Sequence, residues 1–354
     1  MNRLIARVGT VALVMSLAGG SLTACSRSDA SSANAAKQLR LGYFANLTHA
    51  TALVGVKEGF LKDALGDVEL KPQTFNAGPA AVEALFAGSI DAAYIGPNPA
   101  INAFVKSKGE AIRIIAGATS GGASLVVQPD IKGVNDLLGK RVASPQLGNT
   151  QDVALRYWLK KQGVATSITG SSDVTLAPTE NSTSLQLFKD KAIAGAWVPE
   201  PWASRLVLEG GGKVLVNEAD TWPNGQFVTT QLVVRTKFAD ANPAAVEALL
   251  EGHVKTTNWI AANPADAKQA ANGQLDALTT KKLAQDVLDR AWKQLTITED
   301  PLPTTLKTSA DHAFEVGTIK EQADLQGIYD LTALNKILVA AGKKPVSSAG
   351  LGKE

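Results

Sequence analysis

Short apolar runs alternate with helix-type periodicity along the first 120 residues. Runs at 39–43, 70–75, 90–95 and 112–118 predict strands. The intervening segments 49–61, 79–87 and 100–106 carry apolar residues at helical spacing, and Gly88 follows the second of them as a C-cap. Strands that alternate with helices in this way predict an α/β protein with a parallel sheet and helices on both faces.

A second unit of the same kind begins near Gly121. Its expected strands are 124–128, 141–143, 174–177, 194–197 and 213–216, and its expected helices are 134–138, 150–161, 183–189 and 201–209. The run TTQLVVR at 229–235 reads as a strand that returns to the first unit, and residues 243–341 are largely helical by periodicity. The second unit is therefore inserted in the first, with crossings near 120–125 and 225–232, which is a hinge geometry.

The N-terminus predicts export and lipidation. Arg3 and Arg7 precede an uncharged apolar run that is too short for a membrane span, and Leu-Thr-Ala-Cys follows at 22–25. This pattern is typical of a lipoprotein signal peptide, with Cys25 as the lipidated first residue of the mature chain. A plain signal peptide with a chance cysteine is the alternative. Cys25 is the only cysteine, so no disulfide competes for it.

These observations predict a division of the chain into segments. We expect a signal peptide (1–24), a lipid-anchored flexible tether (25–38), lobe I (39–122), an inserted lobe II (123–228), a mainly helical second part of lobe I (229–345) and a flexible tail (346–354). Without Arg3 and Arg7, the 35 basic residues become 33, which equal the 33 acidic residues. This balance argues against a nucleic-acid partner.

The candidate binding residues lie in loops that follow strands and open helices, where open α/β sheets bind ligands. Four such loops cover 46–49, 96–100, 144–152 and 197–202, and a fifth covers 120–124 at the first crossing. Helix N-termini present unpaired N–H groups and a positive dipole end, which favour anionic oxygens. The alternative is that Thr48, Asn149 and Thr150 only cap their own helices.

Two carboxylates and a tryptophan complicate a simple anion site. Glu200 and Asp152 would repel an anion if they faced inward, although either could favour a helix dipole or pair with the amine of a zwitterion. Trp197 could stack on a ligand or pack in the core.

Signatures of an enzyme are absent from the sequence. His49, His253 and His312 are far apart, and the last two are expected at the surface. The chain has no Gly-x-Ser-x-Gly, no P-loop and no free thiol nucleophile, so we predict no catalysis and no metal or cofactor.

Three stretches resemble the nitrate/sulfonate/taurine class of solute-binding proteins. They are LRLGYFANLTHATALVGVKEGFL, FNAGPAAVEALFAGSIDAAYIGPNPA and WVPEPWASR, and the resemblance covers roughly residues 39–330. It implies a type II periplasmic-binding-protein fold whose two lobes close on a ligand. It also implies a chain, expected to be monomeric, that serves an ABC permease and its ATPase from the extracytoplasmic face of the cell membrane.

The resemblance also points to ligand-binding residues and a ligand class. Matched by motif are Asn46, Thr48, His49, Gly96, Pro97, Asn98, Gln146, Asn149, Thr150, Trp197 and Glu200, and the first crossing adds Ser120. The chain lacks the cysteine-rich motif of relatives that bind a thiamine-precursor pyrimidine. Aliphatic sulfonate is therefore ranked first, followed by nitrate or taurine and then a pyrimidine-type heterocycle. A biosynthetic enzyme on the same fold and a sensor domain are the alternatives from other classes.

Overall fold

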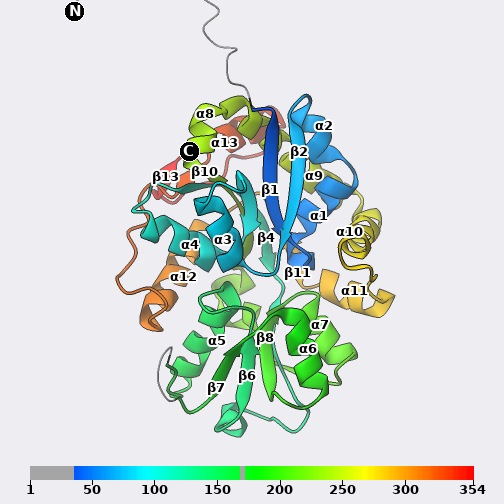
Figure 1. The fold of residues 1–354 in the computed structure, drawn as a ribbon, viewed down its shortest axis with the longest axis vertical. Coiled ribbons are helices and arrows are strands. Elements are labelled where there is room, and N and C mark those ends of the chain that lie inside the picture. Colours follow the sequence, from blue (N-terminus) through cyan, green and yellow to red (C-terminus); the bar gives the residue numbers. More distant parts are fainter. Residues whose placement is uncertain (1–35, 168–171) are drawn as a thin grey trace, which may run out of the picture. The chain divides into compact units, whose positions relative to one another are not determined.

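Two β-sheets organise the chain in a computed structural model that describes residues 36–167 and 172–354 (Figure 1). One sheet takes its strands from residues 38–121 and 228–353, and the other from residues 123–217. We call the parts built on these sheets lobe I and lobe II. The predicted signal peptide, Cys25 and most of the predicted tether lie outside the described residues.

Lobe I is built on a mixed sheet with helices on both sides. The strand order is β13-β12-β4-β10-β3-β1-β2, and β11 pairs with β4. The strands are β1 (Gln38–Phe44), β2 (Glu69–Phe75), β3 (Ala92–Ile95), β4 (Ile112–Gly121), β10 (Val228–Arg235), β11 (Leu295–Ile297), β12 (Tyr329–Asp330) and β13 (Gly352–Lys353). The helices are η1 (Leu47–His49), α1 (Ala50–Lys57), α2 (Phe60–Leu65), α3 (Gly78–Phe86), α4 (Pro97–Lys106), α8 (Thr236–Ala241), α9 (Pro243–Ala262), α10 (Pro264–Thr279), α11 (Gln285–Trp292), α12 (Pro303–Glu315) and α13 (Thr332–Ala340).

Lobe II repeats the architecture on a smaller scale. Its strand order is β7-β6-β8-β5-β9. The strands are β5 (Ala123–Val127), β6 (Arg141–Ser144), β7 (Thr175–Pro178), β8 (Gly195–Pro199) and β9 (Lys213–Asn217). The helices are η2 (Val134–Leu137), α5 (Thr150–Lys161), α6 (Asn181–Lys189), α7 (Trp202–Leu208), η3 (Glu218–Thr221) and η4 (Pro223–Gly225).

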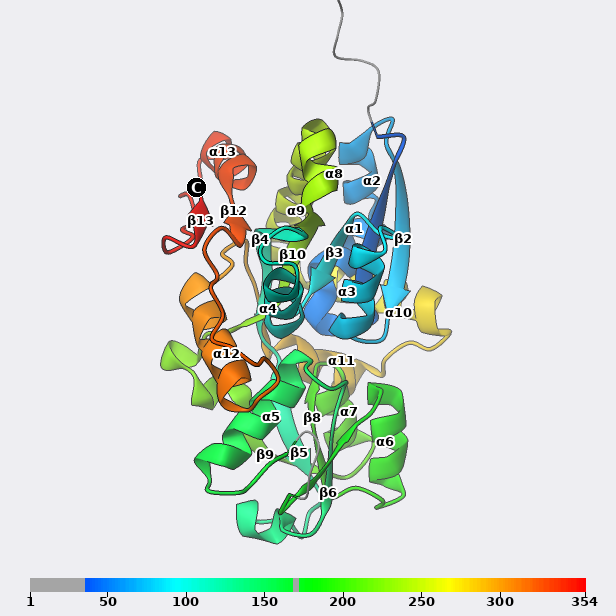
Figure 2. The same cartoon turned by 60° about the vertical axis from the view of Figure 1, so that its left-hand side comes forward.

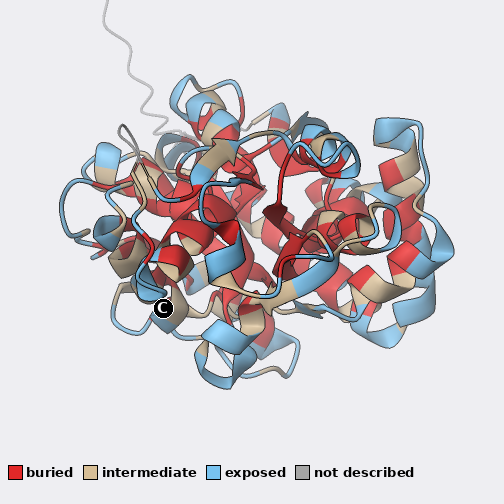
Figure 3. Ribbon diagram, turned by 90° about the horizontal axis from the view of Figure 1, so that it is seen from below, coloured by how far each residue is buried: buried red, intermediate tan, exposed pale blue. Residues whose placement is uncertain are grey.

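Each lobe has its own hydrophobic core. In lobe I, Leu39 and Leu41 of β1 and Leu249 of α9 are fully buried in one large cluster. In lobe II, Leu125 and Phe188 belong to two clusters on opposite sides of the second sheet. Figure 3 shows buried residues along the strands and the inward helix faces, with exposed residues on the outer turns. The apolar periodicity of the sequence therefore marks the faces that pack on the sheets.

Both sheets differ from the predicted all-parallel arrangement. Strand β10 lies antiparallel between β3 and β4, and β5 is antiparallel to β8 and β9. The difference follows from the two crossings, because β4 continues into β5 through Gly121 and Gly122, both of which have φ of 79°. Positive φ at two successive positions favours glycine.

The C-terminal part departs from the sequence prediction at two places. His253, expected at the surface, is fully buried, and its Nδ1 lies 2.9 Å from the Tyr94 hydroxyl. Residues 346–354, expected as a flexible tail, instead pair β13 with β12 and bury Ser348. Short polar segments of this kind carry no periodicity, so only the sheet edge reveals their pairing. Within the two described ranges, no helix has the length and apolar character needed to cross a bilayer.

Candidate functional site

Six parallel strand ends point at the same region between the sheets. In lobe I, β2 and β3 run parallel to β1 on either side, and in lobe II, β7 and β8 run parallel to β6. The segments after all six strands line a small cavity of about 20 Å³, which we call the inner cavity. Its lining is Phe44, Asn46, Thr48, His49, Asn76, Ala77, Gly96, Asn149, Thr150, Gln151, Asn181, Pro199 and Thr229. Carboxyl ends of parallel strands are where open α/β sheets bind ligands.

Four helices begin at the inner cavity. Ala77, Gly96 and Asn149 are the N-cap residues of α3, α4 and α5, and Asn181 is the first residue of α6. None of these four helices has a side-chain hydrogen bond at its N-cap. In α5, the first amide bonded within the helix is that of Asp152, so the amides of Thr150 and Gln151 precede the intrahelical ladder. Four positive dipole ends therefore converge on one cavity.

The inner cavity is polar but carries no charged side chain, since its lining contains no Asp, Glu, Lys or Arg. His49 is also neutral, because burial lowers its pKa to about 3. Its Nδ1 accepts the Phe44 amide at 3.4 Å, so the proton of the neutral ring is on Nε2. The inner cavity thus offers hydroxyl, amide, imidazole and backbone N–H donors without a cation.

Two polar atoms at the inner cavity have no hydrogen-bond partner among the residues that the structure describes. They are Thr150 Oγ1 and Asn181 Oδ1, and both are fully buried. A buried polar atom without a partner costs free energy, so such atoms mark places where a ligand or a water completes the bonding. A volume of about 20 Å³ is enough for a water and too small for an organic ligand.

The two lobes touch directly around the inner cavity. The Trp202 Nε1 donates to Asn46 Oδ1 at 2.7 Å, and the Asn76 amide donates to Glu180 Oε1 at 2.7 Å. The Thr48 amide also donates to the Glu200 carbonyl at 3.4 Å. These contacts join lobe I to lobe II, so the arrangement is a closed one.

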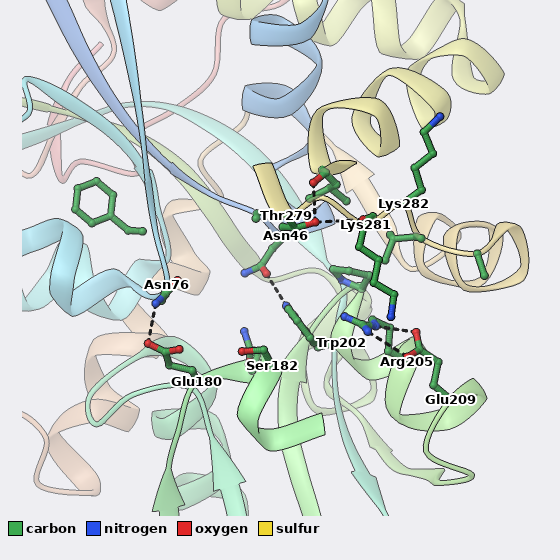
Figure 4. A pocket seen from close by; sticks show the side chains of 17 residues that line it. Asn46, Asn76, Glu180, Ser182, Trp202, Arg205, Glu209, Thr279, Lys281 and Lys282 are labelled. Carbon is green, nitrogen blue, oxygen red and sulfur yellow. Dashed lines mark hydrogen bonds and ion pairs between the residues drawn. The ribbon is translucent and has the colours of Figure 1, made fainter. Parts of the chain in front are cut away.

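A larger pocket of about 540 Å³ adjoins the inner cavity and shares Asn46, Asn76 and Asn181 with it. We call it the outer pocket. Apolar and aromatic walls come from Phe75, Trp202, Leu275 and Leu283. Figure 4 shows the Trp202–Asn46 and Asn76–Glu180 bonds, and Arg205 paired with Glu209, with Lys281 extending toward this pair and Lys282 pointing away from it. The outer pocket has room for an organic group that the inner cavity lacks.

The carboxylates of Glu200 and Asp152 both bond to groups of lobe II instead of facing the inner cavity. The Glu200 carboxylate accepts from the amide and hydroxyl of Ser204, at 3.0 Å each, in the first turn of α7. The Asp152 carboxylate accepts from the Ser144 hydroxyl, the Gly148 amide and the Arg156 guanidinium. Neither lines the inner cavity.

Other residues predicted for the site lie beside the inner cavity. Trp197 is buried in the core of lobe II, with its Nε1 2.7 Å from Glu218 Oε2. Asn98 donates to the Ser309 carbonyl, and Ser120 accepts from the Phe227 amide at the first crossing. Pro97 is buried at the start of α4, and Gln146 is half-buried in the loop after β6. Asn46, Thr48, His49, Gly96, Asn149 and Thr150 are the predicted residues that line the inner cavity.

Sequence reasoning missed Asn76, Asn181, Phe44 and Thr229, and it did not single out Gln151 within the predicted loop 144–152. Asn76 and Asn181 follow β2 and β7 and open α3 and α6, so the rule that found the other loops applies to them too. Thr229 is reached through the second crossing, where its hydroxyl donates to the Gly121 carbonyl at 2.5 Å.

Comparisons with known proteins agree with this architecture. A family model described as the NMT1-like family matches residues 32–273. A taurine-binding periplasmic protein of Escherichia coli is 27% identical over 194 residues, which are 54% of this chain and 57% of that protein. A candidate aliphatic sulfonates-binding protein of Bacillus subtilis is 24% identical over 308 residues, 85% of this chain and 88% of that protein.

Solved structures share the fold. The alkanesulfonate-binding protein from Xanthomonas axonopodis, bound to MOPS, has a TM-score of 0.67 at 19% identity and covers 82% of this chain and 97% of its own. The periplasmic nitrate-binding protein from Synechocystis has a TM-score of 0.67 at 19% identity, covering 81% of this chain and 83% of its own. The predicted type II periplasmic-binding-protein fold is confirmed.

Proposed function

The chain belongs to the NMT1-like family, and on that premise we propose that it is the solute-binding component of an ABC importer. In this proposal it captures a small sulfonate or related oxyanion between its lobes and delivers it to a membrane permease coupled to an ATPase. The convergence of four helix N-termini on a cavity without a charged side chain carries the proposal. Backbone N–H groups and dipole ends favour an anion there.

In this proposal, the anionic oxygens of the ligand lie in the inner cavity. The Thr150 hydroxyl, which lacks a partner, donates to one oxygen, and the Thr150 and Gln151 amides donate to others. His49 Nε2 adds a neutral donor. These donors come from both lobes, so the anion bonds them fully only when the lobes are close.

In this proposal, the organic part of the bound sulfonate lies in the outer pocket. Its apolar walls suit an alkyl chain better than they suit a bare inorganic ion. This favours a sulfonate over nitrate. The inner cavity has no carboxylate for the ammonium of taurine, although Glu180 and Glu209 line the outer pocket.

Entry requires the lobes to separate, because the inner cavity holds only about 20 Å³ in the closed arrangement. The hinge is formed by Gly121–Gly122 and by the second crossing before β10. Closure then forms the Trp202–Asn46 and Asn76–Glu180 bonds, which stabilise the arrangement that a permease recognises.

Calorimetry of the purified protein tests the ligand class. We expect a short alkanesulfonate to bind more tightly than taurine or nitrate, and a pyrimidine to give no heat of binding. If nitrate binds as tightly as butanesulfonate, the assignment of the outer pocket is wrong. If no oxyanion binds while an unrelated ligand does, the oxyanion proposal fails altogether.

A further inference from the structure

A third hollow lies at the opposite end of α5 from the inner cavity, and we call it the aromatic pocket. It encloses about 360 Å³, a size that suits a small ligand. Three of the six tryptophans of the chain line it, although aromatic residues make up only 5% of the sequence. The main walls are Tyr157, Trp158, Trp197, Trp222, His312 and Glu218.

The aromatic walls come from both lobes. Helix α5 supplies Trp158 and β8 supplies Trp197, while α12 of lobe I supplies His312. Helices α5 and α12 lie side by side (Figure 2). Trp222 lies on the segment that leads to the second crossing, and its ring contacts that of His312 on α12.

The rings are arranged as walls of a box. The Trp158 and Trp197 rings meet at 58°, with centroids 6.2 Å apart, and the Trp222 and His312 rings meet at 43° with centroids 5.4 Å apart. One face of Trp222 is covered by Phe227, whose ring stacks on it with centroids 5.6 Å apart, and one face of His312 is covered by Tyr157. The tilted contacts cover the remaining faces only partly, so part of those faces is left to an occupant. Such faces carry partial negative charge and attract cations.

A buried carboxylate adds negative charge to the same pocket. Glu218 is 1% exposed, and among the described residues it forms no ion pair with a lysine or arginine. Its partners are the neutral indole N–H of Trp197, at 2.7 Å, and that of Trp222. Burial raises the pKa of Glu218 to about 7, which reflects the cost of an anion without a countercharge.

The aromatic pocket is also lined by one lysine, Lys161, whose ammonium is held by a ring and not by Glu218. Its ammonium lies over Tyr157, 5.4 Å from the ring centroid, and His312 stacks on Tyr157 with a centroid distance of 3.4 Å. The pair shows that a cation is held by a ring at the rim of this pocket, while Glu218 deeper inside keeps only indole partners.

We propose that the aromatic pocket binds a small organic cation, an alkylammonium or quaternary ammonium group, between its indole walls and the Glu218 carboxylate. Such a cation is weakly hydrated, so it enters an aromatic site at low desolvation cost and supplies the countercharge that Glu218 lacks. A single carboxylate among aromatic walls does not suit a metal ion, which requires several oxygen ligands.

The ammonium group has two sources, a separate molecule or the far end of the captured anion. A small hollow of about 10 Å³ shares the lining residue Thr150 with the inner cavity, and it shares Glu218, Trp222 and His312 with the aromatic pocket. The cation site itself does not depend on the proposed function, because its probe contains no oxyanion.

Tryptophan fluorescence tests the proposal with tetramethylammonium chloride as the probe, against sodium chloride and neutral tert-butanol. We expect saturable binding of tetramethylammonium alone. Glu218→Gln, which keeps an acceptor for the indoles and removes the charge, should weaken it about tenfold or more. Glu110→Gln, at an exposed carboxylate, is the matched control and should leave it unchanged.

The melting temperature of each variant shows whether it is folded, independently of any alkanesulfonate binding. Trp222→Phe, which keeps a ring, should retain most of the tetramethylammonium affinity. If a sulfobetaine binds far more tightly than either tetramethylammonium or an alkanesulfonate alone, the ammonium group belongs to the imported molecule. If the sulfobetaine binds no more tightly than the alkanesulfonate alone, the ammonium group belongs to a separate molecule. The proposal is overturned if tetramethylammonium does not saturate, or if Glu218→Gln and Glu110→Gln behave alike.

Discussion

At the scale of single residues, the inner cavity combines deep burial with electrical neutrality. Thr48, Thr150 and His49 are each no more than 5% exposed, and the lining has no charged side chain. An anion in such a place depends on hydrogen bonds, which are stronger when the acceptor is charged. Each donor therefore contributes a measurable share of affinity.

The Thr150→Val substitution tests one donor. Its hydroxyl has no partner in the closed protein, so its removal should cost little folding stability while it removes one bond to the anion. We expect the Kd for an alkanesulfonate to rise about tenfold, as measured by calorimetry, with an unchanged melting temperature of the free protein.

Thr230→Val provides the matched control. Thr230 Oγ1 is also buried without a partner, but Thr230 does not line the inner cavity. Its variant should keep the wild-type Kd. Equal losses of affinity in the two variants would show that the Thr150 hydroxyl has no direct role.

The buried Glu200 carboxylate should make the folding stability depend on pH. Burial raises its pKa from the ordinary 4.5 to about 7, although Ser204 bonds its carboxylate. The folded protein then holds more protons than the unfolded chain between these values, so this glutamate lowers stability as pH rises from about 4.5 through about 7.

The Glu200→Gln variant keeps the acceptor for Ser204 and removes the titration. Urea unfolding at pH 5 and pH 8 should show that it loses less free energy of unfolding over this range than the wild type does, by on the order of 2 kcal/mol. Parallel changes in both proteins would mean that Glu200 is ionised in the folded state throughout.

The direction of a side chain was beyond the reach of the sequence. Glu200 and Asp152 stand in loops that the sequence correctly placed between strands and helices, yet each carboxylate turns back to bond its own helix start. His253 lies on a helix whose periodicity is weakened by apolar residues on several faces, and only the packing of α9 against the sheet buries it.

At the scale of elements, the strand–loop–helix unit explains most of the site. The sequence predicted the run at 150–161 with the bounds that α5 has, because Asn149 marks its start and its periodicity is uninterrupted. The sequence pattern predicted that α4 begins after Pro99, but the helix begins at Pro97. Proline is tolerated in the first turn of a helix, so Pro97 and Pro99 do not prevent this earlier start. The loops at 76 and 181 follow strands with weak apolar character, β2 and β7, and were overlooked.

The glycine that precedes α4, Gly96, allows a test of how the two lobes close. Gly96 has φ of −73°, which alanine adopts without strain, but a Cβ there would stand 2.3 Å from Thr150 Oγ1 across the two lobes. Gly96→Ala should therefore leave folding intact and hold the lobes apart. We expect about tenfold weaker ligand binding and a larger ligand-bound radius of gyration by small-angle X-ray scattering.

Gly78→Ala separates this effect from general damage. Its Cβ would stand 2.1 Å from Pro99 Cγ within lobe I, so it should lower the melting temperature of the free protein. A Gly96→Ala protein that melts as early as Gly78→Ala, or that closes like the wild type, would contradict the closure argument.

At the scale of the whole molecule, the resemblance noted in the sequence and the matched family agree, and the two sheets follow from the strand pattern. Antiparallel β10 and the pairing of β13 with β12 could not be read from periodicity, since both depend on contacts between distant segments. The ligand class depends on the same distant contacts, because the inner cavity draws on both lobes.

The proposed delivery to a permease requires that the protein stay near the membrane, and the N-terminal sequence indicates how it could be held there. We propose that Cys25 carries a diacylglyceryl anchor after cleavage at residue 24, and that the polar segment 26–37 tethers the lobes. Two acyl chains give stable membrane binding, and a short tether raises the local concentration of the protein at a permease.

The Cys25→Ser variant tests the anchor in its native host. We expect the wild-type protein in the membrane fraction and the variant in the extracytoplasmic soluble fraction, with the same alkanesulfonate Kd in calorimetry, since residue 25 is remote in sequence from every residue that lines the inner cavity. Uptake of a limiting sulfonate should fall in the variant strain, because capture persists while the tethered concentration is lost. A variant that still sediments with membranes would show that another part of the chain holds it there, and the tether argument would then fail while the binding site stands.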